Sequence, residues 1–426
     1  MNVMGKLTIL KQRLQERYLY EWAYRSMPSR QQRYIAKLSK RKEIRVAFFV
    51  LNVSMWKYQG LAYLLRENPR FRVCIVLSPG YSCTQSQQLQ DIRQMRTYFA
   101  ERGMEYIDWR LEDGEPAKDV RQLFDPDIVF YSHPYHGSYH PQHCFLQFTD
   151  RLIAYTPYSY LQSQAPFNYD NVMQNIAWKL YYANRYQMAD ARRLARNKGV
   201  NVVVAGYPSS DVYLYGPSEL AWKDTEHRRK RLIWAPHFTL ANDGSVFSRS
   251  NFLMMADFMV ELAERYRNEL EIAFKPHPNL LSQLQKHPDW GYEKTEAYYK
   301  KWQTMENTQL ADGEFVNLFR DSDAMIHDSG SFVVDYLYFN HPVMFVTRDI
   351  ERAKSYVNEP GKRAYDAHYV GKTLDDVQNF VDQVVLGGND TKQTDRQQFY
   401  SSFLEEADGL TVAQHIYDDM VRSLGV

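Results

Sequence analysis

The stretch IHDSGSFVVDYLYFNHPVMF, residues 326–345, runs from a short apolar strand through a turn of small residues into a helix and a second strand. The apolar run ends at His327, the sequence DSGS (328–331) supplies the turn, and a helix is expected to begin at about Ser331. Strand, turn, helix and strand in immediate succession are typical of a parallel sheet that is covered by helices. This segment therefore predicts an α/β fold.

The same alternation of apolar runs and helical spacing extends along the chain in two series. The expected strands of the first series include 45–52, 71–78, 127–132, 152–157 and 201–208, and those of the second include 231–236, 271–278 and 342–347. A polar, charged stretch at 216–230 separates the two series as a linker. We expect two doubly wound parallel sheets that face each other across a cleft, with ligands beyond the carboxyl ends of the strands.

A chain of 426 residues is long enough for two or three domains. The patterns above divide it into five parts. The parts are a basic helical segment (1–43), a first Rossmann-like domain (44–215), the linker (216–230), a second Rossmann-like domain (231–390) and C-terminal helices (391–426). Each of the two large parts is long enough to bury its own core.

The composition is that of a soluble globular protein, with 44% hydrophobic and 24% charged residues. No apolar run reaches the ~20 residues that span a bilayer, and no apolar region of a signal peptide follows the N-terminus. Cys74, Cys83 and Cys144 are widely scattered and fit neither a disulfide framework nor a paired metal motif. We expect reduced cysteines and a cytoplasmic protein.

The net charge of +1 hides a basic N-terminus, because residues 1–45 hold twelve Lys and Arg against three Glu. Leu10, Leu14, Tyr18 and Trp22 lie among these charges. Basic amphipathic helices with aromatic residues suit an anionic membrane surface, which we expect residues 1–43 to contact. A solvated helix that packs on the following domain is the alternative. Nucleic acid is not expected as a partner, since the remainder of the chain is acidic.

The turn at 328–331 has the features of a phosphate site. Its small residues let a ligand approach the backbone closely, and N–H groups at the start of a helix favour an anion. Asp335 lies one helical turn beyond Ser331 and is placed to accept hydrogen bonds from ribose hydroxyls. An ordinary helix cap with a solvated Asp335 is the alternative interpretation of the same spacing.

Four motifs in order resemble those of the CDP-glycerol glycerophosphotransferases of teichoic-acid and capsule synthesis, a family of GT-B enzymes. They are GYPSSDVY (206–213), LIWAPHF (232–238), FKPHP (274–278) and the segment 326–345. The resemblance implies a GT-B fold of two Rossmann-like domains. It also implies transfer of a polyol-phosphate or sugar group from a nucleotide-activated donor to a glycan or lipid-linked acceptor, a precursor of a cell-surface polymer.

The resemblance also implies a donor site. The residues expected to bind the donor are Lys275, His277, Ser329, Gly330, Ser331, Asp335 and His237, the last standing where the family has threonine. His277 would contact the pyrophosphate and act in catalysis, and Asp335 would hold the ribose. The helix start, His277 and Lys275 would stabilise the charge of the leaving nucleotide, so no metal and no other cofactor is expected.

The chain departs from the family at the presumed general base. The family carries His-Gly-Thr-Pro in the first domain, whereas this chain reads AYTPYSY (154–160) at the matching strand end. The tyrosines there, Tyr155, Tyr158 and Tyr160, would line an acceptor pocket by stacking on a sugar or polyol. The resemblance therefore leaves the general base, and with it the acceptor chemistry, unassigned.

The loop YSHPYHGSYHPQH (131–143) holds four histidines directly after an expected strand. Histidine titrates near neutrality, so His133 or His136 could deprotonate an acceptor hydroxyl. A loop that lines the acceptor pocket without proton transfer is the alternative. A metal site is not expected, because the prolines and glycine of the loop prevent the continuous helix that would hold the ligands rigidly.

Two other functions fit parts of the pattern. The segment 326–345 is similar to the Asp-Ser-Gly-Gly…Glu-Glu motif of non-hydrolysing UDP-GlcNAc 2-epimerases. The chain lacks a counterpart of their His-Arg-Arg-Glu-Asn segment, since HRRK (227–230) begins alike but has no Glu-Asn. A non-catalytic protein that binds a nucleotide sugar on the same fold is the second alternative, and an assay of nucleotide release separates it from an enzyme.

Overall fold

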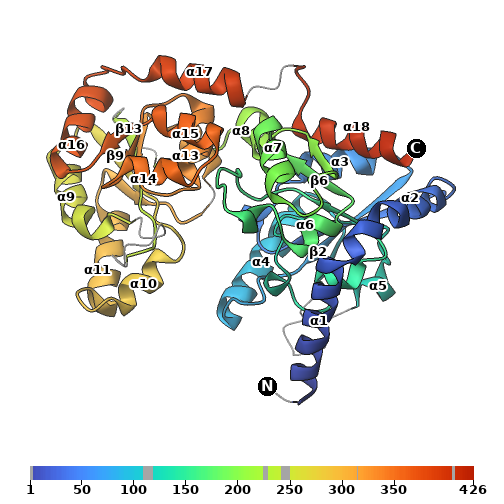
Figure 1. Ribbon diagram of the computed structural model, residues 1–426. Coiled ribbons are helices and arrows are strands. Elements are labelled where there is room, and N and C mark those ends of the chain that lie inside the picture. The colour runs from blue at the N-terminus through green and yellow to red at the C-terminus, as the bar shows by residue number, and fades with distance from the viewer. Residues whose placement is uncertain (1–2, 109–118, 224–228, 241–249, 314, 405–407) are drawn as a thin grey trace. The chain divides into compact units, whose positions relative to one another are not determined.

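The computed structural model describes residues 3–108, 119–223, 229–240, 250–313, 315–404 and 408–426. The chain forms two compact units (Figure 1). Unit 1 comprises Met1–Asp211 and Glu406–Val426, and unit 2 comprises Val212–Glu405. The segment 391–426, expected as one set of C-terminal helices, is therefore divided: α17 (Gln393–Phe403) belongs to unit 2 and α18 (Val412–Leu424) to unit 1.

Unit 1 is built on a sheet of seven parallel strands in the order β3-β2-β1-β4-β5-β6-β7. The strands are β1 (Ile44–Val50), β2 (Phe71–Leu77), β3 (Tyr106–Asp108), β4 (Ile128–Tyr131), β5 (Leu152–Tyr155), β6 (Lys179–Tyr182) and β7 (Val202–Val204). β1 pairs with β2 on one side and with β4 on the other, which is the switch point of a doubly wound sheet. Strands buried on both faces explain the nearly continuous apolar runs.

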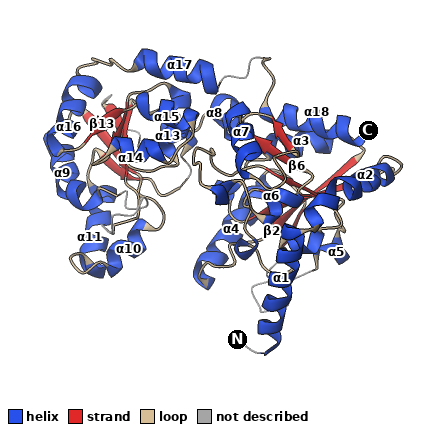
Figure 2. Cartoon of the chain, viewed as in Figure 1, coloured by secondary structure: helices blue, strands red, loops and turns tan. Residues whose placement is uncertain are grey.

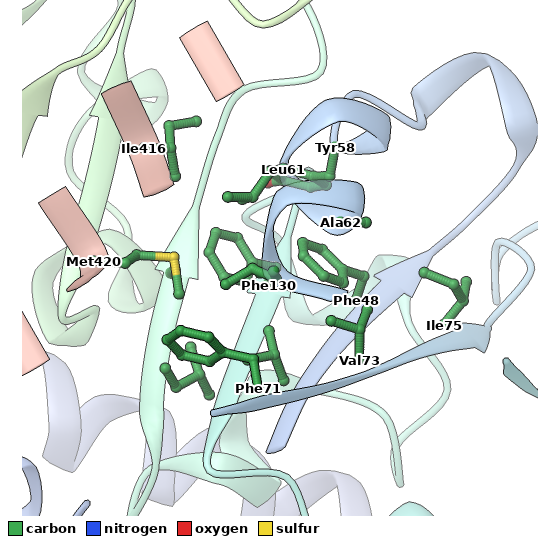
Figure 3. Close-up of a cluster of buried hydrophobic side chains, with 14 of the residues drawn as sticks. Phe48, Tyr58, Leu61, Ala62, Phe71, Val73, Ile75, Phe130, Ile416 and Met420 are labelled. Atoms are coloured by element: carbon green, nitrogen blue, oxygen red, sulfur yellow. The ribbon is translucent and has the colours of Figure 1, made fainter. Parts of the chain in front are cut away.

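Helices cover both faces of this sheet (Figure 2). They are α1 (Val3–Glu21), α2 (Met27–Leu38), α3 (Gln59–Glu67), α4 (Gln85–Glu101), α5 (Val120–Leu123), α6 (Val172–Ile176), α7 (Arg185–Leu194) and α18, while α8 (Ser209–Tyr215) crosses the boundary between the units. α18 packs beside α3 and brings Ile416 and Met420 into the same buried cluster as Phe48, Leu61 and Phe130 (Figure 3). The C-terminal helix α18 thus contributes to the hydrophobic core of unit 1, which is otherwise formed by the N-terminal half of the chain.

Unit 2 contains a sheet of six parallel strands in the order β10-β9-β8-β11-β12-β13. The strands are β8 (Lys230–Ala235), β9 (Leu270–Phe274), β10 (Thr308–Leu310), β11 (Ala324–His327), β12 (Val343–Val346) and β13 (Tyr369–Gly371). Here β8 lies between β9 and β11, so the switch point falls between β8 and β11. Both units therefore have the Rossmann-like strand order, and the predicted α/β, doubly wound fold class is confirmed.

The helices of unit 2 are α9 (Phe252–Arg265), α10 (Leu280–Lys286), α11 (Gly291–Thr304), α12 (Val316–Arg320), α13 (Phe332–Asp335), α14 (Ile350–Ser355), α15 (Glu359–Asp366), α16 (Leu374–Asn379) and α17, with a π-helical turn at Phe380–Leu386. α13 has only four residues and continues as the 3-10 helix η6 (Tyr336–Phe339). The 3-10 helix η6 ends at Phe339, and Asn340 adopts a left-handed conformation with φ 54°. His341 and Pro342 then lead into β12.

The basic N-terminal segment packs on unit 1 through polar contacts. Tyr20 donates to Asp170 (2.7 Å), Glu16 pairs with His136 (2.9 Å) and Gln15 donates to the Leu146 carbonyl (3.1 Å). The opposite face of α1 carries large apolar side chains that are 54–61% exposed, namely Leu7, Leu10, Leu14, Tyr18 and Trp22. Their spacing of three and four residues places them in one stripe. The segment therefore packs on unit 1, as the alternative interpretation has it, and contact of its exposed apolar side chains with a membrane stays a prediction.

No helix among the described residues combines the length and apolar character that crossing a bilayer requires.

Candidate functional site

Three motifs of the sequence meet at the carboxyl edge of the unit 2 sheet. His237 follows β8, Lys275 and His277 follow β9, and the turn at 328–331 follows β11. The Asp328 carboxylate accepts hydrogen bonds from the backbone N–H groups of His237 (2.6 Å) and Asn251 (2.5 Å). The imidazole rings of His237 and His277 lie 5.1 Å apart between centroids. The expected donor residues on these three strand ends are therefore neighbours.

His277 is poised to donate one hydrogen bond as a neutral ring. Its Nδ1 accepts from the backbone N–H of Asn279 (3.1 Å), which leaves the proton on Nε2. Burial, aided by the nearby Lys275 charge, lowers the pKa of His277 to about 4. The ring of Phe238 packs 4.4 Å away between centroids. Near neutral pH His277 therefore offers a phosphate an N–H donor rather than a positive charge.

Lys275 supplies the positive charge at this edge but is held by the protein backbone. Its side chain is 7% exposed, and its ammonium group donates to the carbonyl of Gly313 (3.1 Å). The ammonium group also lies 5.6 Å from the centroid of the Phe315 ring. Lys275 is thus fixed in place, and its role as a donor ligand stays a prediction.

The turn after β11 rests on two buried histidines. Ser329 is 5% exposed, and its carbonyl oxygen lies 3.1 Å from Nδ1 of His327. Nε2 of His327 lies 3.2 Å from Nε2 of His368, whose Nδ1 lies 2.7 Å from the Ala364 carbonyl oxygen. Gly330 is buried and Ser331 is exposed, so the turn reaches the surface at its last residue. Because α13 is so short, a phosphate here would be held by N–H groups of the turn and not by a helix dipole.

Asp335 is the last residue of α13 and is 4% exposed. A carboxylate this buried is not the solvated side chain of the alternative interpretation. Its contact with a ribose stays a prediction, because burial places it behind the turn and not on the surface.

The histidine loop of unit 1 does not form one cluster. His133 contacts Ser138 (Nδ1 to Oγ, 2.7 Å) and stacks on Tyr158 at 5.5 Å between centroids, whereas His136 pairs with Glu16 of α1. Burial lowers the pKa of His133 to about 4, and the Glu16 carboxylate raises that of His136. His143 is fully buried, 3.0 Å from the Ser78 hydroxyl. His133 and His136 therefore have opposite electrostatic surroundings.

Of the expected acceptor tyrosines, only Tyr158 is exposed, at 37%. Tyr155 is 2% exposed within the core, and Tyr160 is 6% exposed with its hydroxyl accepting from Asn184 (2.5 Å). Tyr155 belongs to β5, where a side chain buried against the next layer cannot stack on a sugar. Tyr135, which the sequence did not single out, lies 4.9 Å from His133 between ring centroids and is 38% exposed.

Within the described part of the chain, no group of three or more His, Cys, Asp or Glu side chains is arranged to hold a metal ion. The residues that sequence reasoning missed are Asp328, Asn251, His327 and His368. The position of Asp328 directly after a strand was a usable signal, because the first residue beyond a strand lies at the ligand edge of such sheets. No local pattern marks His368 as a partner of His327.

Comparison with known proteins identifies the family. The model of the CDP-glycerol:poly(glycerophosphate) glycerophosphotransferases matches residues 161–422, more than half of the chain. The chain belongs to this family. The predicted family is thereby confirmed, and the three strand-end motifs of unit 2 lie inside the matched range.

A curated relative of this chain is the minor teichoic acid biosynthesis protein GgaB of Bacillus subtilis (strain 168). It is 24% identical over 196 residues, which are 44% of this chain and 20% of GgaB. The match thus spans about a fifth of the length of that relative.

Solved structures support the GT-B fold of this chain. A variant of the wall teichoic acid polymerase TagF has a TM-score of 0.58 and 14% identity, over 100% of this chain and 98% of that one. A UDP-N-acetylglucosamine 2-epimerase has a TM-score of 0.55 and 10% identity, over 90% of this chain and 96% of that one. At such identities the likeness concerns the fold alone, so the epimerases share the architecture with this chain.

Proposed function

We propose that this chain is a GT-B transferase that moves a glycerol-phosphate-like group, or a sugar, from a nucleotide-activated donor to a cell-surface glycan precursor. The observation that carries the proposal is the meeting of His237, His277 and the 328–331 turn at the switch-point edge of unit 2. The family match covers all three segments. CDP-glycerol is the first donor to consider, since the family is named for it and TagF has been solved after a soak with CDPG.

With CDP-glycerol, an acceptor hydroxyl oxygen would attack the phosphorus that carries glycerol. The bond from this phosphorus to the oxygen of CMP would break, and CMP would leave with the electron pair. Nε2–H of His277 and the N–H groups of the turn would stabilise the charge on the leaving CMP. A histidine, His133 or His136, would take the proton of the acceptor. Transfer of a sugar would instead release a nucleoside diphosphate from a UDP- or GDP-sugar, and CMP from a CMP-sugar.

The proposal includes a place of action, the cytoplasmic face of an anionic membrane. The apolar stripe of α1 faces away from the contacts that hold α1 on unit 1. Exposed Lys11, Arg13 and Arg17 belong to the same helix. An apolar stripe flanked by Lys and Arg is the arrangement by which a helix lies in the interface of an anionic bilayer. A lipid-linked acceptor would be reached from there.

The test is an assay of nucleotide release by the full chain. CDP-glycerol, CDP-ribitol and common UDP-, GDP- and CMP-sugars are each incubated with a teichoic-acid-like acceptor, with and without EDTA. We expect acceptor-dependent release of CMP, or of a nucleoside diphosphate from a sugar donor, that persists in EDTA. Tight binding of a donor with no release in any mixture would favour the non-catalytic alternative, and conversion of UDP-GlcNAc to its 2-epimer would favour the epimerase.

A further inference from the structure

His327 and His368 form a buried pair directly beneath the 328–331 turn. His327 is 1% exposed and His368 is 2% exposed. The pair makes three contacts in line, from the Ser329 carbonyl through Nδ1 and Nε2 of His327 to Nε2 and Nδ1 of His368 and on to the Ala364 carbonyl, at 3.1, 3.2 and 2.7 Å. The two ends of this line are carbonyl oxygens, which can only accept.

The number of protons decides which contacts are hydrogen bonds. Both Nδ1 atoms must carry a proton to donate to the two carbonyls, and two neutral imidazoles then have no proton left. The two Nε2 lone pairs would face each other at 3.2 Å. If the proton of His327 moves to Nε2, the two Nε2 atoms can form a hydrogen bond. The Nδ1 lone pair of His327 then faces the Ser329 carbonyl oxygen. Only a pair with one extra proton satisfies all three contacts.

The surroundings of the pair do not favour that extra proton in the absence of a ligand. Burial lowers the pKa of His327 and lowers that of His368 to about 4. The charges of Arg396 and Lys392 act in the same direction on His368. Arg396 is itself paired with Asp390. Neutral aromatic rings also lie beside the pair, namely Phe332 and Phe345 beside His327, and Tyr365 and Phe345 beside His368.

The helix that follows the turn, α13, packs against α15 and carries one further titratable group, the buried Asp335. Among the residues that the structure describes, no carboxylate hydrogen-bonds to a ring nitrogen of the pair, and the two carbonyls occupy both outer positions. A negative charge that arrives at the turn would favour the extra proton, which the charges of Arg396 and Lys392 oppose.

We propose that His327 and His368 are positioning residues of the donor turn, which take up one shared proton when a nucleoside diphosphate binds at Ser329–Ser331. The inference rests on the proposed function for the place of the ligand. The bound diphosphate supplies the negative charge that stabilises the proton. The proton in turn allows Nδ1 of His327 to donate to the Ser329 carbonyl while the two Nε2 atoms share a hydrogen bond, which fixes the turn around the phosphate.

The experiment is calorimetric titration of the full chain with CDP-glycerol at pH 7 in buffers of different ionisation enthalpy. Each phosphorus of CDP-glycerol carries one ester and one anhydride bond and a single, strongly acidic hydroxyl that is fully ionised at this pH, so proton uptake reports on protein groups. The key variant is His368→Asn, whose amide N–H can replace Nδ1–H toward Ala364. His327 then keeps its proton on Nδ1 for Ser329 without an extra proton. The matched control is His287→Asn, a histidine of the same unit outside the site.

We expect the wild type and His287→Asn to take up the same number of protons per CDP-glycerol bound. His368→Asn should take up fewer, by close to one proton. Wild-type affinity should fall by up to about tenfold per pH unit between pH 6 and 8, and His368→Asn should show a flatter dependence. A merely structural role for the pair would change affinity without changing proton uptake.

Equal proton uptake by the wild type and His368→Asn would overturn the inference while leaving the donor site intact. His327→Asn gives a second measurement if His368→Asn does not fold, because its amide N–H can also donate to Ser329 without a shared proton. Failure of the wild type to bind any nucleotide donor would overturn the proposed function, and the inference with it.

Discussion

The carboxylate of Asp328, at the end of β11, accepts a hydrogen bond of 2.6 Å from the backbone N–H of His237, at the end of β8. These are the two strands that flank the switch point of unit 2. A second N–H donor, from Asn251, approaches the other carboxylate oxygen at 2.5 Å. Burial nevertheless raises the pKa of Asp328 to about 6. One buried carboxylate thus joins the strand ends that would carry the donor.

Asp328 should make the stability of the protein depend on pH. Because its folded-state pKa is raised from 3.8 to about 6, the folded protein keeps the proton to a higher pH than the unfolded chain. The stabilisation is complete below about pH 4 and is lost as pH rises to about 6, by about 3 kcal/mol. Urea unfolding between pH 4 and 7.5 should show this loss in the wild type and in Asp289→Asn, an exposed control. A loss of equal size in Asp328→Asn would contradict the assignment.

Two substitutions of His277 should distinguish the contributions of its two ring nitrogens to donor binding. Glutamine places an N–H donor near the position of Nε2, whereas asparagine can replace only Nδ1, which accepts from Asn279. We expect His277→Asn to weaken CDP-glycerol binding about tenfold or more, the cost of a lost hydrogen bond to a charged group. His277→Gln should retain part of the affinity. Equal, wild-type affinity in both variants would show that the phosphate lies elsewhere.

Asp335 should recognise the ribose and not the phosphates. If its carboxylate accepts from ribose hydroxyls, Asp335→Asn should weaken CDP-glycerol binding about tenfold while leaving inorganic pyrophosphate binding unchanged. His277→Asn should weaken the binding of both CDP-glycerol and pyrophosphate. Asparagine is chosen because Asp335 is 4% exposed, and a smaller residue would leave a cavity. A parallel loss for both ligands in Asp335→Asn would indicate a structural role.

The pH dependence of kcat/KM should identify the general base. A base must be unprotonated, so activity falls as pH drops through its pKa. With His133 as the base, the acid limb should lie near pH 4, because burial lowers its pKa to about 4. With His136, the limb should lie above 6.5, because Glu16 raises its pKa. The corresponding glutamine variant should lose the limb, and a limb unchanged in both variants would exclude both histidines.

The apolar stripe of α1 should hold the protein on anionic vesicles. We expect the double variant Leu10→Ser/Leu14→Ser to lose binding to vesicles that contain phosphatidylglycerol, while Leu123→Ser, an equally exposed leucine of α5, binds as the wild type does. High salt should weaken the wild-type interaction, because Lys and Arg contribute by charge. Deletion of residues 1–40 is a poorer test, since Met27 and Leu38 are buried in the unit 1 core.

Much of the fold could be predicted because buried strands are recognisable as short runs of apolar residues. The apolar run expected at 324–327 is β11, and the run at 45–52 covers most of β1 (Ile44–Val50). The same reasoning placed His237, His277 and the turn on strand ends, which parallel topology then brings to one edge. Strand order and spacing could therefore predict that these residues are neighbours, whereas their role toward a donor was implied by the resemblance to the family.

Other features could not be read locally. Tyr155 looked available for stacking, but it lies on the buried β5, and exposure depends on what packs over a strand. The partner of His327 is His368, 41 residues later in the chain, and no pattern links them. The expected helix at 332–339 changes to a 3-10 turn after Asp335, a distinction that hydrophobic spacing does not contain.

The position of α18 affects the order in which the protein can fold during synthesis. Unit 1 lacks Ile416 and Met420 until the ribosome has added all of Val212–Glu405, an interval on the order of ten seconds or more. Unit 2 is continuous in sequence and needs no later segment. The nascent chain can therefore complete its second unit before its first, and the core around Phe48 and Leu61 would lack these two side chains during that interval.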